Sequence, residues 1–495
     1  MKRVFLGIII ALVASSSLLY WTQPDRASPI PVLYWITQDD EVKRETIVLF
    51  KEWLAEKNLP PVDIKIDNTN QGVMKKLTQG LAGVGSDIMD VYGNEIELFG
   101  SSGMLMDVTE RAKELGFSPD ATYPALRSDV LHEGKQYGFP RNAAAAMYWI
   151  NKDTFARYGI EEPPHRWTWD EFERIGKQFV AAANPPGTRD RIFFMKPPSS
   201  AVTMQEFRRG MGLSAYNETM TECILDDPRS VEVYRRVYRW VIELKLIPTI
   251  ADASAMTADS AIPGGATFHL FSVGRYAMLN LPRWALIRLR PLGKLPLRVI
   301  EPPNTGFSNI VFGCGLISAY TNTKYPEETT RFMQFLTSES FNLLVARSGD
   351  SLPPVPKYTQ SEEFLRPPEH PEEWQAGEVF SRSAPAIGIP TSRSPFVQTT
   401  IFVRIESQVQ QSLLAGRLTP EEAAKTQADR TNKEIMITLT EDPKKKILYA
   451  ELREVQKKID ELKAANLPIP RKWITNPFHL HYYEHKGMLT EEDSS

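Results

Sequence analysis

The chain has 495 residues, of which 42% are hydrophobic and 24% are charged. This length is too great for one hydrophobic core and is sufficient for two. The 58 Lys and Arg residues nearly balance the 61 Asp and Glu residues, so the net charge is −3 at pH 7. Such a balance gives no electrostatic reason to expect a nucleic-acid partner.

The N-terminus has the pattern of an export signal. Lys2 and Arg3 precede a nearly continuous apolar run from Val4 to Trp21, which is typical of signal peptides. No cysteine follows this run directly, which excludes a lipoprotein anchor. The run is also close to the length that spans a bilayer, with its basic residues on the inner side. We expect residues 1–27 to be a signal peptide or an uncleaved inner-membrane anchor, and the remainder to be periplasmic or otherwise extracytoplasmic.

Strands and helices alternate over the first hundred residues. The hydrophobic pattern predicts strands at 31–36, 62–67 and 88–92, with helices between them at about 42–53 and 73–81. This order builds a parallel sheet with helices on its faces. Ligands bind such sheets beyond the carboxyl ends of the strands. The polar residues that follow the three strands are Asp39, Asp40, Asp67, Asn70, Asp90, Tyr92, Asn94 and Glu95.

The stretch 137–172 reads as an extended segment, a buried strand at 147–150, a short helix and a second helix. Gly159 stands where a left-handed residue ends a helix. Thr168 and Glu171 have the spacing of a capping box. The pattern favours a junction between two halves of the chain.

Later elements follow the same rules. We predict strands at 276–281 and 309–318, one helix beginning at Pro326, and a helix at 398–414. Residues 356–395 are rich in proline and are expected to be irregular. Thr419 and Glu422 form a second capping box, with Pro420 at the first helical position.

The composition changes at residue 442. Five apolar residues step by four and three through a segment rich in Lys and Glu, namely Leu448, Leu452, Val455, Ile459 and Leu462. This two-heptad seam either pairs with another helix or packs back onto the body of the protein. The tail contains His479, His481 and His485, whose spacing would suit a metal, although coincidence explains it as well.

Four stretches, taken in order, resemble family 1 extracellular solute-binding proteins, the maltose-binding-protein-like carbohydrate receptors of ABC importers. They cover about residues 31–435, and the usual lipobox cysteine is absent. The stretches are 86–89 with 103–109; 137–140 with 148–155, Gly159 and 168–172; 268–284; and 313–318 through 332–338 to Leu352-Pro353.

The resemblance implies an α/β, two-lobed periplasmic-binding-protein type II fold, in which three hinge crossings join the lobes. Residues 28–140 and 305–350 would form lobe one, and residues 145–300 and 355–440 would form lobe two. Residues 138–146 would be the first crossing, and residues 441–495 would be a charged helical extension and tail. Cys223 and Cys314 would then lie in different lobes, where a disulfide would obstruct hinge closure; we expect two free thiols.

The same resemblance implies a sugar as ligand and the permease subunits of an ABC transporter as partners. Hydroxyl groups need charged or amide side chains, and the flat C–H face of a sugar needs an aromatic plate. Trp284 matches the family's stacking tryptophan, and Asp39 or Asp40 matches its first polar contact. The candidate ligand-binding residues are Trp35, Asp39, Asp40, Asp90, Tyr92, Asn94, Arg141 and Trp284.

Some alternatives remain open from the sequence. Trp35 suits core packing as well as the site. Arg141 would either bind an acidic or sulfated ligand or pair with a carboxylate of the cleft.

The protein class also has alternatives. A non-sugar solute would suit the same fold. Asp39 and Asp40 would suit glycoside hydrolysis only poorly, because that reaction needs opposed carboxylates. Motifs for phosphate, zinc or nucleophilic chemistry are absent from the sequence. We therefore expect a binding protein that needs no cofactor or metal, rather than an enzyme.

Overall fold

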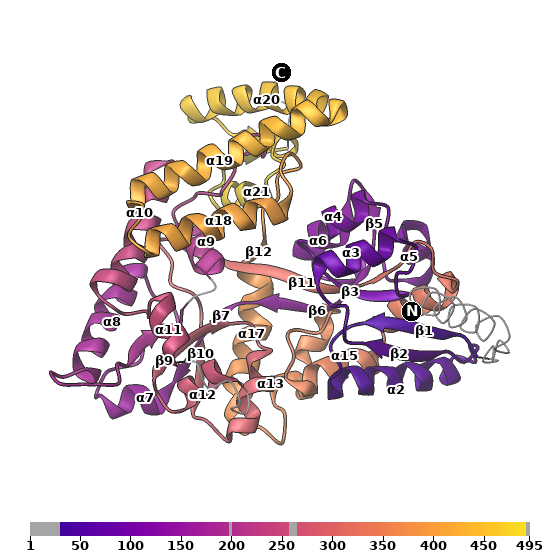
Figure 1. Ribbon diagram of the computed structural model, residues 1–495, viewed down its shortest axis with the longest axis horizontal. Helices are drawn as coiled ribbons and strands as arrows, with labels where there is room; N and C mark the ends of the chain where they lie inside the picture. The colour runs from indigo at the N-terminus through magenta and orange to yellow at the C-terminus, as the bar shows by residue number, and fades with distance from the viewer. Residues whose placement is uncertain (1–29, 198–199, 257–264, 492–495) are drawn as a thin grey trace, which may run out of the picture.

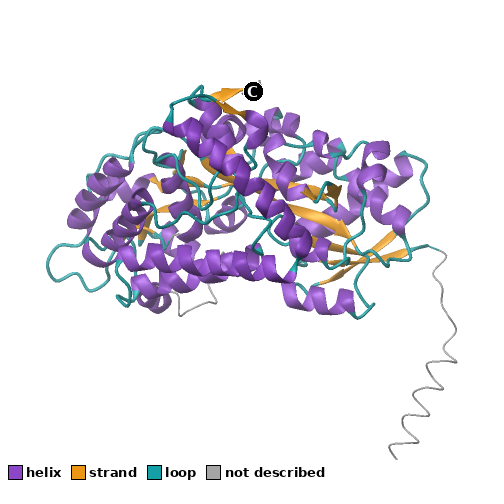
Figure 2. Cartoon of the chain, turned by 90° about the horizontal axis from the view of Figure 1, so that it is seen from above, coloured by secondary structure: helices purple, strands orange, loops and turns teal. Residues whose placement is uncertain are grey.

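The computed structural model describes residues 30–197, 200–256 and 265–491. The chain forms two α/β lobes that lie side by side, each with a central sheet (Figure 1). Seen from above, the strands lie inside each lobe and the helices lie outside them (Figure 2). Within the described residues, none of the helices is both long and apolar enough to cross a membrane. The predicted signal peptide or anchor, residues 1–27, lies outside this part of the chain.

Lobe one is built on the predicted parallel unit. Strand β1 (Val32–Ile36) pairs in parallel with β2 (Asp63–Asp67) on one side and with β3 (Ile88–Tyr92) on the other. The sheet continues through β11 (Ile310–Ala319), which is antiparallel to β3. Its helices are α2 (Glu41–Glu56), α3 (Val73–Leu81), α4 (Ile96–Ser101), α5 (Thr109–Leu115), α6 (Arg127–Val130), α14 (Pro326–Phe335) and α15 (Glu339–Ser348).

Lobe two has a four-stranded sheet in the order β10-β7-β9-β8. Strands β8 (Phe193–Met195) and β9 (Tyr276–Leu281) are parallel, so both end at the same edge. Strands β7 (Met147–Asn151) and β10 (Leu297–Ile300) are antiparallel to their neighbours. The helices of this half are α7 (Lys152–Arg157), α8 (Trp169–Ala183), α9 (Ser200–Gly210), α10 (Pro228–Tyr238), α11 (Ile250–Met256), α12 (Ala266–Ser272) and α13 (Ala285–Leu289).

Two antiparallel strands connect the lobes. Strand β6 (Phe139–Ala145) pairs with β11 over nearly its whole length, with a register shift at Gly315/Leu316. Within residues 138–146, the predicted first crossing, residues 139–145 therefore form a strand, which agrees with the extended segment expected there. The start of β11 also pairs in parallel with β12 (Gly388–Pro390), although residues 355–440 were assigned to lobe two on the resemblance.

Two predicted capping boxes and one predicted C-terminal glycine cap are confirmed. Thr168 and Glu171 form a reciprocal capping box on α8, and Thr419 and Glu422 form another on α19 (Pro420–Glu441). Gly159 has φ +63°, the left-handed conformation expected after α7. Such caps satisfy amide and carbonyl groups that the helix itself leaves unpaired.

Two predictions about the later chain are wrong. The single helix expected from Pro326 is two helices, because Ser338 begins α15 with its own cap. The stretch 356–395 is not irregular throughout. It contains α16 (Glu362–Leu365) and the 14-residue α17 (Trp374–Ile387), whose Pro385 lies inside the helix. Because proline normally ends a helix, the proline-rich composition of this stretch gave no indication of α17.

The apolar seam after residue 442 is buried mainly by the tail that follows it. In helix α20 (Pro443–Ala464), Val455, Ile459 and Leu462 pack with Ile469, Ile474 and Tyr483 of the tail, whereas Leu452 packs with the body. Ile459 is fully buried, whereas Leu448 stays exposed. The last helix, α21 (Pro477–His485), packs against Phe307 and Ile389 through Phe478. The alternative of a coiled coil with a partner is therefore not needed to bury the seam.

A buried carboxylate joins this extension to lobe two. Glu218, which is only 2% exposed, accepts hydrogen bonds from Gln456 Nε2 (2.8 Å), Lys463 Nζ (2.6 Å) and Tyr483 Oη (2.5 Å). Burial by itself raises the pKa of Glu218, but His479, Lys463 and Tyr483 lower it to about 2. All three hydrogen-bond donors come from the extension, so Glu218 stabilises its docking.

Both cysteines are free and buried, as predicted. Cys314 lies in β11, next to Asp129, whereas Cys223 lies near α19, where its backbone pairs with Asn432. Burial raises the pKa of both thiols, which keeps them protonated and unreactive.

We predict that Glu218→Gln lowers the free energy of unfolding by about 3 kcal/mol at pH 7, because the pKa of Glu218 falls from its ordinary value to about 2 on folding. A group with a lowered folded-state pKa stabilises the fold above its unfolded pKa, and the effect is lost as the pH falls towards 2. Urea unfolding at pH 7 and pH 3 measures both values.

The matched control is Glu222→Gln, whose exposed ion pair with Arg453 should contribute less than about 1 kcal/mol. Equal losses in the two variants would contradict a special role for Glu218.

Candidate functional site

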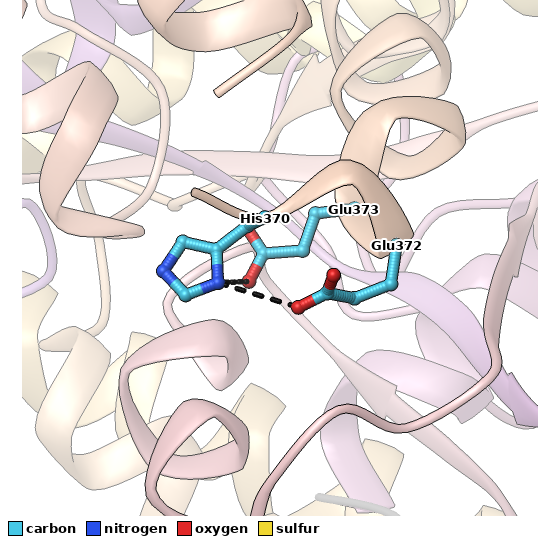
Figure 3. A group of neighbouring side chains, drawn as sticks. All are labelled: His370, Glu372 and Glu373. Carbon is cyan, nitrogen blue, oxygen red and sulfur yellow. Dashed lines mark hydrogen bonds and ion pairs between the residues drawn. The ribbon is translucent and has the colours of Figure 1, made fainter. Parts of the chain in front are cut away.

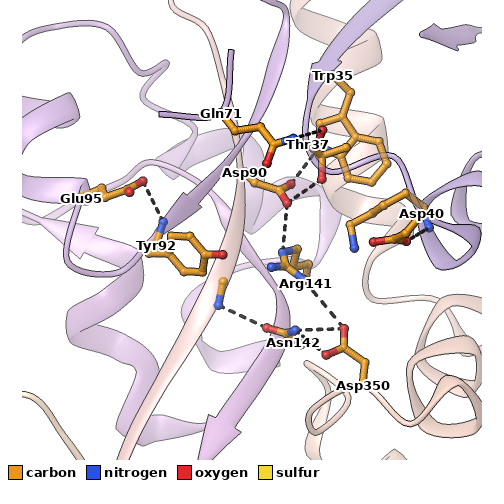
Figure 4. Close-up of polar contacts among 12 residues, drawn as sticks. Trp35, Thr37, Asp40, Gln71, Asp90, Tyr92, Glu95, Arg141, Asn142 and Asp350 are labelled. Carbon is orange, nitrogen blue, oxygen red and sulfur yellow. Dashed lines mark hydrogen bonds and ion pairs between the residues drawn. The ribbon is translucent and has the colours of Figure 1, made fainter. Parts of the chain in front are cut away.

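Asp90 is the centre of the polar cluster at the carboxyl edge of the lobe-one sheet (Figure 4). Its Oδ1 accepts a hydrogen bond from Trp35 Nε1 (2.9 Å), and its Oδ2 accepts one from Thr37 Oγ1 (2.7 Å). Both donors lie on or directly after β1, next to β3. The carboxylate is therefore held in one orientation from the strand beside it.

Trp35 supports this carboxylate from the core. It is 1% exposed, and its ring lies edge-on to Phe332 with 5.3 Å between centroids. A buried indole has no free face on which a sugar can stack. Core packing, one of the two roles that the sequence left open, is the one that this geometry supports.

Arg141 lies between two carboxylates. Its Nε is 3.4 Å from Asp90 Oδ2, and its Nη1 is 3.8 Å from Asp350 Oδ2. Asn142 Nδ2 also donates to both oxygens of Asp350, at 3.2 and 3.1 Å. Although burial opposes the effect, Asp90 and Asp350 raise the pKa of Arg141. Two negative charges and one positive charge leave no unpaired cation here for an acidic ligand.

Asp39 and Asp40 have local structural partners. Asp40 caps α2 by accepting from Lys43 N (2.9 Å), and Asp39 pairs with Arg44 Nε (2.8 Å). Asp39 is exposed and Asp40 is half-buried, so oxygen atoms of both remain within reach of a ligand. The two carboxylates do not face each other across a gap, which is the arrangement that glycoside hydrolysis needs.

Tyr92 and Asn94 form the exposed rim of the cluster. Tyr92 is 52% exposed and its ring lies beside Arg141 in Figure 4, while Asn94 is exposed in the turn before α4. Glu95 holds this turn, because its Oε2 accepts from Tyr92 N (3.2 Å) and from Lys76 Nζ (3.0 Å). The turn thus offers one aromatic face and one amide to solvent.

Trp284 comes from the opposite lobe. It precedes α13 and follows the end of β9, and its ring lies edge-on to Phe268 with 6.0 Å between centroids. The preceding residue, Arg283, is buried and donates to Asp350 O (2.8 Å) and Ala346 O (3.0 Å) of lobe one. This edge of the lobe-two sheet therefore adjoins the segment that holds Arg141.

Sequence reasoning missed several residues of this region. Asp350 and Thr37 complete the carboxylate cluster, yet neither belongs to a motif. Lys196 directly follows β8 at the same edge as Trp284 and is 7% exposed, and among the described residues its Nζ donates only to Pro197 O (2.9 Å). Burial lowers the pKa of Lys196 to about 8. In the sequence, only the short apolar run Phe193–Met195, followed by a lysine and two prolines, could have indicated that Lys196 ends a strand at this edge.

A second cluster has ligand types that suit a metal. His370 Nδ1 lies 3.3 Å from Glu372 Oε1 and 3.8 Å from Glu373 Oε1 (Figure 3). Glu373, however, already binds Arg290 through two bonds of 2.9 Å. That arginine neutralises the carboxylate on which a cation would depend, so these residues do not fit a metal ion.

The histidines of the tail have other partners. His479 Nε2 lies 3.1 Å from Tyr216 O, and His481 Nδ1 lies 2.8 Å from Pro477 O. His485 packs edge-on to Phe307. Their sequence spacing therefore follows from helix packing.

Comparison with known proteins gives a family and a fold. A family model described as bacterial extracellular solute-binding protein matches residues 51–372. An uncharacterized ABC transporter extracellular-binding protein of Pyrococcus horikoshii is 24% identical over 276 residues, which are 54% of this chain and 59% of that protein. The chain thus spans about three fifths of the length of this curated relative.

Solved structures of substrate-binding proteins have a similar fold. An ABC substrate-binding protein of Listeria monocytogenes in complex with cycloalternan has a TM-score of 0.66 at 20% identity, covering 82% of this chain and 98% of that one. A solute-binding protein of Thermotoga lettingae bound with α-D-tagatose also has a TM-score of 0.66, at 19% identity and with 82% and 100% covered. The maltose-bound MalE3 of T. maritima has a TM-score of 0.64 at 16% identity, with 81% and 98% covered. At these identities the likeness shows the two-lobed fold alone.

We predict that Arg141→Met lowers the free energy of unfolding by about 3 kcal/mol at pH 7, because it leaves Asp90 and Asp350 without their shared cation. Arg141 and Lys43 lower the pKa of Asp350 against the effect of burial. The stabilisation is therefore present above the unfolded pKa of an aspartate and is lost below about pH 4.

Chemical denaturation at pH 7 and pH 3.5 checks this expectation. Arg44→Met, which removes the exposed pair with Asp39, is the matched control and should change stability far less than Arg141→Met does. A loss for Arg141→Met that is the same at both pH values would contradict the ion-pair explanation.

Proposed function

Because the chain belongs to the family of bacterial extracellular solute-binding proteins, we propose that it captures a sugar or oligosaccharide between its lobes and delivers it to the permease of an ABC transporter. Capture would occur by hinge closure over residues 138–146 and the other two crossings. We propose the lobe division 28–140 with 305–350, and 145–300 with 355–440. The body would act outside the cytoplasm, with residues 1–27 as signal or anchor.

The observation that carries the proposal is the cluster in which Arg141 is already paired with Asp90 and Asp350, beside an exposed aromatic and amide rim. A neutral, hydroxyl-rich ligand suits such a site, because it needs oriented hydrogen-bond partners and no net charge. The exposed ring of Tyr92 and the ring of Trp284 would stack on sugar C–H faces. Asp39, Asp40, Asp90 and Asn94 would bind hydroxyl groups, and Trp35 would hold Asp90 in place.

The relatives support this choice at the level of the fold. Cycloalternan, tagatose and maltose are bound by the similar proteins that were compared. Their low identity leaves the sugar of this chain open, so the absence of a free cation beside Asp90 and Asp350 is the stronger argument. The second candidate is a non-sugar solute with acidic character, which the buried and unpaired Lys196 would favour.

A glycoside-acting enzyme fits less well. Asp39 pairs with Arg44 and Asp40 caps α2, so neither carboxylate is arranged as a general acid opposite a nucleophile. If the protein released a reducing sugar from a glycoside, that result would support the enzyme alternative.

We predict that at least one neutral sugar raises the melting temperature of residues 28–495. A ligand that binds only the native state stabilises it by mass action, by about 2.7 kcal/mol at one hundred times the dissociation constant. A thermal-shift screen of neutral and acidic sugars, amino acids and polyamines measures this effect. A shift with amino acids or polyamines alone would reject the sugar and leave the fold unaffected.

We further predict that Trp284→Ala and Tyr92→Ala each weaken binding of that sugar about tenfold or more, which corresponds to about 1.4 kcal/mol per tenfold. Isothermal titration calorimetry provides the measurement. Trp374→Ala is the matched control, because Trp374 is similarly exposed but lies in α17, with its indole nitrogen bonded to Pro367 O. Unchanged affinity in the first two variants would contradict the stacking assignment.

A further inference from the structure

One residue of the C-terminal extension contacts lobe one. Lys445 Nζ, in the first turn of α20, lies 4.0 Å from Glu97 Oε1, in the first turn of α4. The side chains are 26% and 16% exposed, so the pair is largely shielded from water. Glu97 follows the rim residue Tyr92 by five positions. We call Glu97 and Lys445 the α4–α20 contact.

The ammonium group of Lys445 stabilises the ionised carboxylate of Glu97. Burial raises the pKa of its carboxyl, and Lys445 is the strongest influence in the opposite direction, followed by Thr399 and Arg393. A buried carboxylate without a partner destabilises the arrangement that buries it. Lys445 therefore lowers the cost of holding α4 against the extension.

A second ion pair joins lobe one to the segment that follows β12. Arg393, between β12 and α18 (Thr399–Leu414), pairs with Asp129 of α6 at 2.6 Å and donates to Ser128 O at 3.3 Å. Asp129 is buried and its Oδ2 accepts from Cys314 N (3.1 Å). Helices α4 and α6 of lobe one are thus both held by cations from the last quarter of the chain.

The extension is firmly attached to lobe two. Gln456 and Lys463 of α20 bind Glu218, and Gln456 Oε1 also accepts from Thr219 N (3.1 Å). Helix α21 also packs against Phe307 and Ile389, so the extension contacts both halves of the molecule. Because α20 itself is bound to lobe two, a rotation of one lobe against the other would change the distance between Lys445 and Glu97.

The local sequence gives no other reason for this lysine. Lys444, Lys445 and Lys446 stand in the first turn of α20, where the positive end of the helix dipole disfavours cations. Contact with Glu97 offsets this cost for Lys445. The other two lysines remain exposed.

We propose that the extension regulates ligand affinity by stabilising the open arrangement of the lobes through the α4–α20 contact. The described arrangement is open in the sense that Tyr92 and Asn94 are exposed to solvent. An interaction present in only one of two states shifts their populations by its own free energy. The contact thereby weakens ligand binding and favours release. This inference rests on the proposed hinge closure of the protein.

The test uses the full chain with spin labels on Lys57→Cys and Arg189→Cys, which are exposed positions on the two lobes. Cys223 and Cys314 are buried and stay unlabelled. Lys445→Glu, which repels Glu97, should shift the label-to-label distance distribution towards a second, closed population. Lys446→Glu makes the same change of charge on an exposed neighbour and should leave the distribution unchanged. The double variant Glu97→Lys with Lys445→Glu restores opposite charges and should restore the original distribution.

Affinity provides a second readout, with maltotriose as the probe. Lys445→Glu should bind it roughly threefold or more tightly, as expected for a partly shielded ion pair, and the charge-swapped variant should return to the original affinity. An unchanged distance distribution in Lys445→Glu, or one that the swap does not restore, would overturn the inference. If maltotriose and the other sugars of the screen do not bind while the distances shift as expected, the sugar assignment fails and the role of the contact stands.

Discussion

The pairing of β6 with β11 is the constraint on which the two-lobed structure depends. These antiparallel strands connect the sheet of lobe one to the start of lobe two. Strand β11 also binds β3 and β12, so chain segments from the first, middle and last thirds meet at one strand. The hydrogen bonds of this ladder hold the two lobes in one register at their junction.

The candidate site is assembled by the same geometry. Arg141 lies on β6 and Asp90 lies on β3, and the two strands flank β11. Asp350 enters from the segment after α15, and Arg283 of lobe two binds its backbone. Ion pairing at the site and contact between the lobes thus involve the same few residues. A ligand that accepts or donates hydrogen bonds at Asp90 or Asp350 would therefore also affect the contact between the lobes.

Much of lobe one could be predicted from the sequence, because its strands are short apolar runs and its helix caps use specific residue pairs. Strands β3 and β9 have the predicted bounds. Helix α17 could not be predicted, since Pro385 lies inside it and tertiary packing overrides local preference. The sequence left open that Arg141 pairs with a carboxylate of the cleft, but it could not single out Asp350, which is 209 residues away and belongs to no motif. Ion pairs between such distant residues depend on which strands lie side by side in the fold, and the spacing of residues in the sequence does not reveal this.

Glu218 has a consequence for any shortened form of the chain. All of its side-chain hydrogen-bond donors come from residues 456–483. The family match ends at residue 372, so the extension lies beyond the matched region. Removal of the extension would take away these three donors together, and Glu218 would have to exchange them for water.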